Sequence, residues 1–488
     1  MKKAGVLVPL FSLPNRHGIG DFGKETLEFI DGLSRCKVKI WQILPLNPVG
    51  FGYSPYQPFS SYAGDEIFIS LDKLKDDGLI TESLDDFKKN ANKVDYHDVK
   101  LNKDKWLRIA YEGFKSSKLT ESKDYKEFIK EAFWLKEYAL FVAFKLKNDL
   151  KSWTEWEDKY RNWDFDSKLD VELQDEVNYV YFLQYYFYKQ WLEVKEYANK
   201  LDIEVMGDIP FYVGIDSADV WAAKDMFELN DGYPTVIAGV PPDYFSKEGQ
   251  RWGNPIYNWK TLEQTDYDLW IKRLSWNNKL FDIIRLDHFR AFDTYWAINP
   301  KCDTAIDGEW LLGPAHKLLD KIYEKIEGIH LIAEDLGDLR PEVLELRDYY
   351  KLKGMDIVQF ALNGKKRNIE LEQKIRTIAY TGTHDNQTIV GWYSCLNIKD
   401  KKKVLRNLSS KKICMGDIAQ RVVEYTLSLE AEYAIIPIQD IIGVSDVGRL
   451  NTPSTIGSPN WEYRFNSLAD IQGRLDWLQN VVSKYHRF

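Results

Sequence analysis

Eight short apolar runs that each end in polar residues recur along this chain of 488 residues. Runs of this length and composition predict strands of a parallel sheet that are buried on both faces. They occupy residues 5–10, 39–46, 203–211, 281–289, 329–336, 355–362, 378–385 and 433–440. Amphipathic stretches with helical period accompany most of them, at residues 24–33, 267–280, 310–327, 341–352, 416–429 and 467–484.

This alternation of strand and helix predicts an α/β fold, the (β/α)8 or TIM barrel, over residues 1–488. A doubly wound open sheet is the alternative packing of the same elements. Two insertions interrupt the repeat. Residues 81–200 are rich in charge and have helical period, which predicts an inserted, mainly helical subdomain. Residues 215–260 predict an inserted loop region, which is either a binding loop over the barrel mouth or an ordinary surface loop.

The charge balance and the cysteines limit the possible partners. The net charge is −9 with a pI near 5.5, and the two signs are interspersed, which argues against nucleic acid as a partner. The four cysteines have no C-x-x-C spacing, as is typical of a reducing compartment. The N-terminal apolar run is too short for a signal peptide and no apolar span of about 18 residues occurs. We therefore expect a cytoplasmic protein without a membrane partner; the sequence indicates no oligomeric state.

Polar residues close most of the predicted strands. The active site of a (β/α)8 barrel lies at the carboxyl ends of its strands, so these residues should meet at one mouth. They are Asp208, Arg285, Asp287, Glu334, Asp335, Gln359, His384, Asp385 and Gln439. Side chains alternate along a strand, so Arg285 and Asp287 share one face, and the guanidinium can hold the carboxylate ionised. A purely structural ion pair at the strand end is the alternative.

Three of these carboxylates, Asp287, Glu334 and Asp385, close three different strands. Cleavage of a glycoside with retention needs two carboxyl groups roughly 5 to 5.5 Å apart, one as nucleophile and one as acid. A third can hold ring hydroxyls in the transition state. Carboxyl groups crowded into one pocket cannot all stay ionised, so one of them keeps a proton and supplies the acid.

Two other kinds of site are not supported by the residue spacing. Residues 18–23 spell G-x-G-x-x-G before a helix, but a seven-residue connection separates them from the first strand, and no acidic residue closes the second strand to hold a ribose. The glycines fit a tight turn instead. His288, Glu334, His384 and Asp385 lack the H-x-H or H-E-x-x-H spacing of a metal hydrolase. We expect neither a cofactor nor a metal.

The sequence resembles the 4-α-glucanotransferases called amylomaltase or disproportionating enzyme, glycoside hydrolase family 77 of the α-amylase clan. Eight segments carry the resemblance in order over nearly the whole chain. They are S-L-P-N at 12–15, G-I-G-D at 18–21, S-P-Y-Q at 54–57, G-D-I-P at 207–210, the loop 241–255, R-L-D-H-F-R at 285–290, A-E-D-L-G at 333–337 and G-T-H-D-N at 382–386. The segment N-T-P-S-T at 451–455 departs from the N-T-P-G-T-like pattern of the family, which bears on acceptor or remote-sugar contacts and not on the reaction type.

The resemblance implies a barrel without a separate C-terminal β-domain and a role for each site residue. Asp287 is implied as nucleophile, Glu334 as general acid/base and Asp385 as transition-state stabiliser. The implied substrate-binding residues are Tyr56, Asp208, Tyr244, Phe245, Gln250, Trp252, Arg285, Asp335 and His384. The implied reaction cleaves an α-1,4-glucan donor and passes the glucan to the 4-hydroxyl of an acceptor glucan or glucose.

Two other functions fit the same residues. An α-glucan hydrolase would use the same three carboxylates and differ only in admitting water to the glycosyl-enzyme. A non-catalytic glucan-binding barrel would keep the cleft, but it has no use for an acid and a nucleophile on separate strands. Exclusion of water and binding of an acceptor sugar decide between transfer and hydrolysis.

Overall fold

Eight parallel strands form a barrel in a computed structural model that describes residues 2–84, 92–242, 246–363 and 374–488. In chain order they are β1 (Lys3–Leu7), β2 (Ile40–Gln42), β3 (Glu204–Ile209), β8 (Ile283–Leu286), β11 (Leu331–Ala333), β12 (Gly354–Ile357), β13 (Thr377–Tyr380) and β14 (Tyr433–Pro437). The sheet runs β11-β8-β3-β2-β1-β14-β13-β12, and a parallel bridge between Ile332 and Lys353 joins its two edges. Each strand overlaps one predicted run. The barrel is confirmed, and the open sheet is wrong because the outer strands are neighbours.

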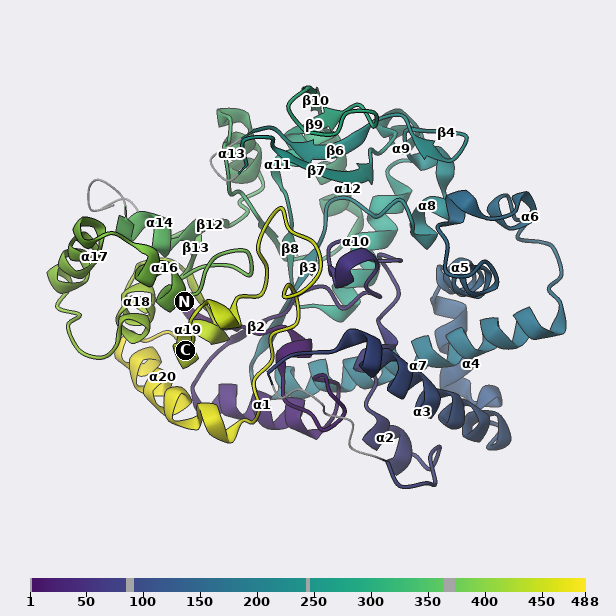
Figure 1. Ribbon diagram of the computed structural model, residues 1–488, viewed down its shortest axis with the longest axis horizontal. Helices are drawn as coiled ribbons and strands as arrows, with labels where there is room; N and C mark the ends of the chain where they lie inside the picture. The colour runs from purple at the N-terminus through teal and green to yellow at the C-terminus, as the bar shows by residue number, and fades with distance from the viewer. Residues whose placement is uncertain (1, 85–91, 243–245, 364–373) are drawn as a thin grey trace.

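Helices surround this barrel and fill its long connections (Figure 1). Those before β8 are α1 (Lys24–Arg35), α2 (Leu71–Asp76), α3 (Tyr96–Ser116), α4 (Lys123–Glu131), α5 (Leu135–Lys147), α6 (Asp158–Arg161), α7 (Val171–Lys200), α8 (Ala218–Ala222), α9 (Trp259–Gln264) and α10 (Asp268–Leu280). Those after β8 are α11 (Arg290–Asp293), α12 (Ala315–Lys325), α13 (Pro341–Tyr349), α14 (Val358–Asn363), α16 (Ile389–Cys395), α17 (Ile398–Ser410), α18 (Ile418–Leu427), α19 (Ile438–Ile442) and α20 (Gln472–Lys484).

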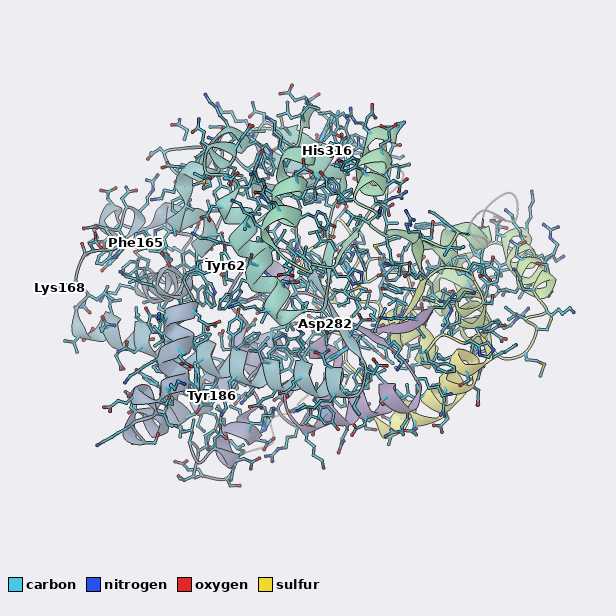
Figure 2. All side chains as sticks on the ribbon, turned by 180° about the vertical axis from the view of Figure 1, so that it is seen from behind. Tyr62, Phe165, Lys168, Tyr186, Asp282 and His316 are labelled. Atoms are coloured by element: carbon cyan, nitrogen blue, oxygen red, sulfur yellow. The ribbon has the colours of Figure 1, made fainter. Side chains whose placement is uncertain are left out.

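The helices of residues 81–200 gather on one side of the barrel, opposite α16, α17, α18 and α20 (Figure 1). Side chains of Asp95, Ser122 and Asp170 accept hydrogen bonds from free N–H groups in the first turns of α3, α4 and α7, which is why these helices begin where they do. The aromatic face of α7, with Tyr186 labelled in Figure 2, is buried against α3 and α4. Large aromatic rings therefore form the core of this region.

A second, antiparallel sheet covers one side of the barrel mouth. Its order is β10-β9-β6-β7, with β6 at Ile237–Val240, β7 at Gln250–Pro255, β9 at Thr294–Ile298 and β10 at Gly308–Leu312. Residues 215–260 thus contain strands, including the short hairpin β4 (Leu229–Asn230) and β5 (Tyr233–Pro234). The helix predicted from residue 310 is wrong at its start, because Trp310 pairs with Trp296 on β9 and α12 begins at Ala315.

After β14 the described chain forms helices, turns and loops, with no further strand among the described residues. Between β14 and residue 488, all of which the structure describes, there is therefore no separate β-domain, as predicted. In the part of the chain that the structure describes, no helix combines the length and the apolar character needed to cross a membrane.

The glycine-rich segment 18–23 makes a tight turn into α1, as predicted. Gly18 has a φ of +86°, which favours glycine, and Gly23 is the N-cap residue of α1. The carboxylate of Asp21 accepts a hydrogen bond from the N–H of Gly23 and lies 3.1 Å from Nζ of Lys103 on α3. Lys103 also donates to the carbonyls of Ile67 and Ile69, so one fully buried ammonium joins three segments.

Replacing Lys103 by Met is expected to lower the free energy of unfolding by about 3–5 kcal/mol, because it leaves the buried Asp21 carboxylate without its cation. Urea unfolding measures this change. The matched control is Lys105→Met on the same helix, where the side chain is exposed, and it should change stability by less than about 1 kcal/mol. Equal effects of the two substitutions would contradict a structural role for the buried pair.

Candidate active site

Arg285 lies at the centre of the barrel mouth, on β8. Its Nη1 donates to both carboxylate oxygens of Asp208, each at 2.7 Å, and to Oδ1 of Asp287 at 3.0 Å. Asp208 faces Arg285 across the β3–β8 pairing, and Asp287 follows two residues later on the same face. The predicted pairing of Arg285 with Asp287 is confirmed, and Asp208 is a second partner of the guanidinium. Burial opposes the charge of Arg285, but the two carboxylates outweigh it and raise the pKa of the guanidinium.

The opposite end of β8 carries a different carboxylate, Asp282, which Figure 2 labels beside α7. Asp282 pairs with Lys195 and accepts hydrogen bonds from Asn199 and from the N–H of Val205. These bonds join β8 to α7 and β3. A carboxylate that joins β8 to α7 and β3 thus precedes the strand, and a carboxylate in contact with Arg285 follows it, as expected of a barrel whose chemistry lies at the carboxyl ends.

Glu334 follows β11, the neighbour of β8, and is tied to the turn that carries Asp287. Its Oε2 accepts from the N–H of His288 at 2.9 Å, and its Oε1 accepts from the N–H of Leu336 at 3.1 Å. The backbone N–H of Glu334 donates to the carbonyl of Leu286 at 3.0 Å. The two strand ends therefore hold each other, so the two carboxyl groups have a fixed relative position.

The two carboxyl groups differ in their charge partners. Burial raises the pKa of Glu334 to about 8, with Asp287 adding to the rise and Arg285 opposing it. Burial also raises the pKa of Asp287, to about 6, but here the Arg285 guanidinium makes a direct contact that favours the anion. Near neutral pH the arrangement therefore pairs an ionised carboxylate with a protonated carboxyl group, which is what a nucleophile and a general acid require.

His384 and Asp385 follow β13 on the other side of the mouth. The ring of Tyr56 stacks on His384 with centroids 5.0 Å apart, and its hydroxyl donates to Oδ2 of Asp208 at 2.7 Å. Nε2 of His384 lies 3.5 Å from Oδ2 of Asp385. The side chain of Asn451 donates to Oδ1 of Asp385 at 2.7 Å. Tyr56 thus connects the Arg285 cluster to the segment that carries the third carboxylate.

A cavity of about 660 Å³ opens over these groups. Six of the predicted residues line it: Tyr56, Gln250, Trp252, Asp287, His384 and Asp385. Trp252 stands edge-on to His288 with ring centroids 4.9 Å apart, and its Nε1 donates to Oε1 of Gln250. Asp208 and Arg285 are buried behind this surface and contact it through Tyr56 and Asp287. The predicted loop residues Tyr244 and Phe245 lie outside the described residues.

Asp335 is a different case from its neighbour Glu334. One of its oxygens accepts from the N–H of Met355, and the other pairs with Arg347. Neither Asp335 nor Glu334 is among the residues that line the cavity. Successive side chains at a strand end point in opposite directions, so a neighbour of Glu334 is turned toward β12 and α13. The bonds of Asp335 are those of a residue that supports the strand ends.

The site residues predicted from the sequence did not include several residues that line the cavity, although the resemblance linked 451–455 to acceptor or remote-sugar contacts. Asn451, Pro453, Ser454, Thr455 and Trp461 line the cavity from the segment after α19, and His288 lines it beside Asp287. The turn-rich composition of residues 451–455 is the signal that could have placed this segment in a loop at the mouth. Among the described residues, no group of three or more His, Cys, Asp or Glu side chains is arranged to hold a metal ion.

Comparison with known proteins agrees with this geometry. Residues 8–470 match the family described as 4-alpha-glucanotransferase. The chain belongs to this family. The 4-alpha-glucanotransferase of Clostridium butyricum is 41% identical over 466 residues, which cover 93% of this chain and 94% of that protein. The enzyme of that name from Streptococcus pneumoniae (strain R6) is 39% identical over 497 residues, covering 100% and 97%.

A solved structure resembles this 4-alpha-glucanotransferase over its full length. It is the amylomaltase from Streptococcus agalactiae in complex with acarbose, with a TM-score of 0.93 and 34% sequence identity, covering 100% of both chains. The family and the fold implied by the sequence motifs are therefore confirmed.

Proposed function

We propose that this 4-alpha-glucanotransferase transfers α-1,4-glucan segments with retention, through a covalent glycosyl-enzyme on Asp287. One observation carries the proposal. Two carboxyl groups close the neighbouring strands β8 and β11, and only one of them, Asp287, has a guanidinium in contact. Glu334 accepts backbone hydrogen bonds and has a pKa raised to about 8. Neighbouring carboxyl groups with such different surroundings suit two different roles.

In the first step a carboxylate oxygen of Asp287 attacks the anomeric carbon of the donor. The bond from that carbon to the glycosidic oxygen breaks, and Glu334 gives its proton to the departing oxygen. The remainder of the donor leaves with a new hydroxyl, and the transferred glucan stays on Asp287 as an ester. Arg285 stabilises Asp287 as the anion before attack.

In the second step the 4-hydroxyl of an acceptor sugar attacks the same carbon. Glu334, now ionised, takes the hydroxyl proton, and the bond to Asp287 breaks and restores the carboxylate. Two displacements at one carbon give net retention. Asp385, half-exposed at the cavity wall, holds sugar hydroxyls in both transition states.

The cavity walls suit α-1,4-glucans as donor and acceptor. The rings of Trp252 and Tyr56 offer apolar surface to the C–H faces of sugars, and Gln250, His384 and Asp385 offer polar groups to the hydroxyls. The solved amylomaltase from Streptococcus agalactiae holds acarbose, which supports a saccharide as the occupant. Maltodextrins and amylose are the substrates that we propose.

Incubation with maltotriose tests the proposal. Transfer gives glucose and longer oligomers while the concentration of reducing ends stays constant, because each bond broken is matched by one formed. A steady rise in reducing ends would instead identify an α-glucan hydrolase. If the concentration of maltotriose does not change but its binding is measurable by calorimetry, the protein is a non-catalytic glucan-binding barrel.

We expect a bell-shaped dependence of kcat/KM on pH. Activity should rise through about pH 6 as Asp287 loses its proton, and fall above about pH 8 as Glu334 loses the proton that the leaving oxygen needs. The two limbs describe the coupled pair, so they shift together if either group is changed. Initial rates of glucose release from maltotriose between pH 4 and about pH 10 measure the profile. A rate that still rises above about pH 9 would contradict the acid role of Glu334.

Organisation and location are further parts of the proposal. We propose that residues 1–488 form one catalytic barrel unit, with residues 81–200 as a helical subdomain and 215–260 as an active-site loop region. The helices α3 to α7 and the lining residues Gln250 and Trp252 support this division. We also propose a cytoplasmic location, because the four cysteines, two of them exposed, are unpaired. Cell fractionation with an antibody to the chain tests the location.

A further inference from the structure

The chain after α19 crosses the barrel mouth and is held there by its own hydrogen bonds. It is the yellow segment that passes in front of β3 and β8 in Figure 1. The N–H of Trp461 donates to the carbonyl of Leu450, and the N–H of Thr452 donates to the side-chain oxygen of Asn460. Trp461 is buried and lies 5.8 Å from the rings of both Tyr56 and His384. Residues 449–461, called here the crossing segment, therefore form a fixed wall of the cavity.

This crossing segment makes three hydrogen bonds to the turn that carries Asp385, and a fourth bond within the segment supports them. Nδ2 of Asn451 donates to Oδ1 of Asp385 at 2.7 Å, and the N–H of Asn451 donates to the carbonyl of His384 at 3.1 Å. The guanidinium of Arg449 donates from Nη2 to the carbonyl of Asp385 at 2.8 Å and from Nε to the carbonyl of Asn451 at 2.7 Å. Arg449 thus joins the two backbones, and Asn451 joins the backbone and the carboxylate.

We propose that Asn451 and Arg449 are positioning residues that fix the orientation of the Asp385 carboxylate toward the sugar at the point of cleavage. The inference rests on the proposed function, because it takes Asp385 to hold sugar hydroxyls in the transition state.

The choice of donors fits this role. The terminal torsion of an Asp side chain is broad, so the half-exposed Asp385 carboxylate needs an external contact to hold one orientation. Asn451 supplies it through a neutral amide, which fixes Oδ1 without cancelling the negative charge. The cationic Arg449 donates its hydrogen bonds to two backbone carbonyls and not to the carboxylate. The crossing segment therefore contacts the carboxylate only through a neutral amide on Oδ1, and Oδ2, which lies 3.5 Å from Nε2 of His384, remains for hydroxyl donors. Asp287, in contrast, has the Arg285 guanidinium in direct contact.

A pair of fluoride donors tests the inference. α-Maltotriosyl fluoride needs no proton for its leaving group, and its analogue without the 2-hydroxyl on the reacting sugar removes a hydrogen bond that strengthens in the transition state of retaining enzymes. With Asn451→Ala we expect kcat on the parent donor to fall by about 10- to 100-fold, with KM within about threefold, because a misplaced group acts on the transition state. On the 2-deoxy donor the same substitution should cost less than about threefold.

Arg449→Lys should reproduce this pattern in weaker form, since a single ammonium cannot bridge two carbonyls in the geometry of a guanidinium. Val447→Ser is the matched control, because Val447 is 74% exposed, precedes Arg449 by two residues and lies outside the cavity; its rates should equal those of the unchanged protein. An equal loss of kcat on both donors would overturn the inference. So would an unchanged kcat on the parent donor in either of the two variants, Asn451→Ala or Arg449→Lys. If the unchanged protein fails to convert maltotriose, the proposed function is wrong. That result is distinguishable from a failure of the inference, which is tested by the Asn451→Ala variant.

Discussion

Asp287→Asn is expected to lower glucan transfer from maltotriose by about 10⁴-fold or more, because an amide cannot form the glycosyl ester. The substitution is isosteric, and Arg285 keeps its two bonds to Asp208, so the mouth should keep its shape. Binding of a non-reacting oligosaccharide should therefore remain measurable by calorimetry. The rate is measured as initial glucose release by the unchanged and substituted proteins at equal concentration.

Asp282→Asn provides the control for this experiment. It is the same substitution on the same strand, but at the end that contacts Lys195 and Asn199 of α7 (Figure 2). We expect this variant to lose some stability, because an amide cannot form the ion pair with Lys195. Its kcat should stay within about twofold of that of the unchanged protein, because position 282 lies at the end of β8 opposite to Asp287. Transfer by the Asp287→Asn protein at the unchanged rate would remove Asp287 from the mechanism and end the proposed assignment.

The barrel could be predicted because a strand that is buried on both faces has a continuous apolar sequence. A strand such as β14 is apolar throughout, and a polar residue marks the point where the chain leaves the core. The strands of the second sheet have no such continuous apolar sequence. Strand β9 pairs with β6, some sixty residues earlier, and β10 has only exposed and half-buried residues in no regular alternation. The pairing of this sheet therefore depends on contacts that the local sequence pattern does not contain. The helical period around Trp310 was therefore misleading.

The site was predictable as far as it follows from strand ends. Parallel strands bring their carboxyl ends to one edge, which was enough to place Asp287, Glu334 and Asp385 at the same mouth. The same rule placed Asp335 there as well, but it cannot distinguish a carboxyl group held against the turn after Asp287, as Glu334 is, from one that pairs with Arg347. The contact of Asn451 with Asp385 was missed for a related reason: it joins segments 66 residues apart, and only the folded chain brings them together.

The acid role of Glu334 has its own experiment. Glu334→Ala should lower transfer from maltotriose by about 10³-fold, within the range for loss of a general acid, because the departing sugar oxygen then leaves as an alkoxide. The same variant should react with α-maltotriosyl fluoride at a first-step rate closer to that of the unchanged protein, since fluoride leaves without a proton. The falling limb of the pH profile above about pH 8 should disappear with the group that titrates there.

Azide adds a direct chemical readout to this variant. Without Glu334 no base takes the proton of the acceptor hydroxyl, so the glycosyl ester on Asp287 should accumulate. Azide is a small anion that needs no deprotonation, so it should attack this ester and give an α-glycosyl azide. The α configuration of that product would report two displacements at one carbon. Glu345→Ala, at an exposed position on α13, is the matched control and should show neither the donor dependence nor the azide product. Equal losses on maltotriose and on the fluoride would mean that Glu334 acts by holding the turn at His288, through the hydrogen bond from that backbone N–H, and not as the acid.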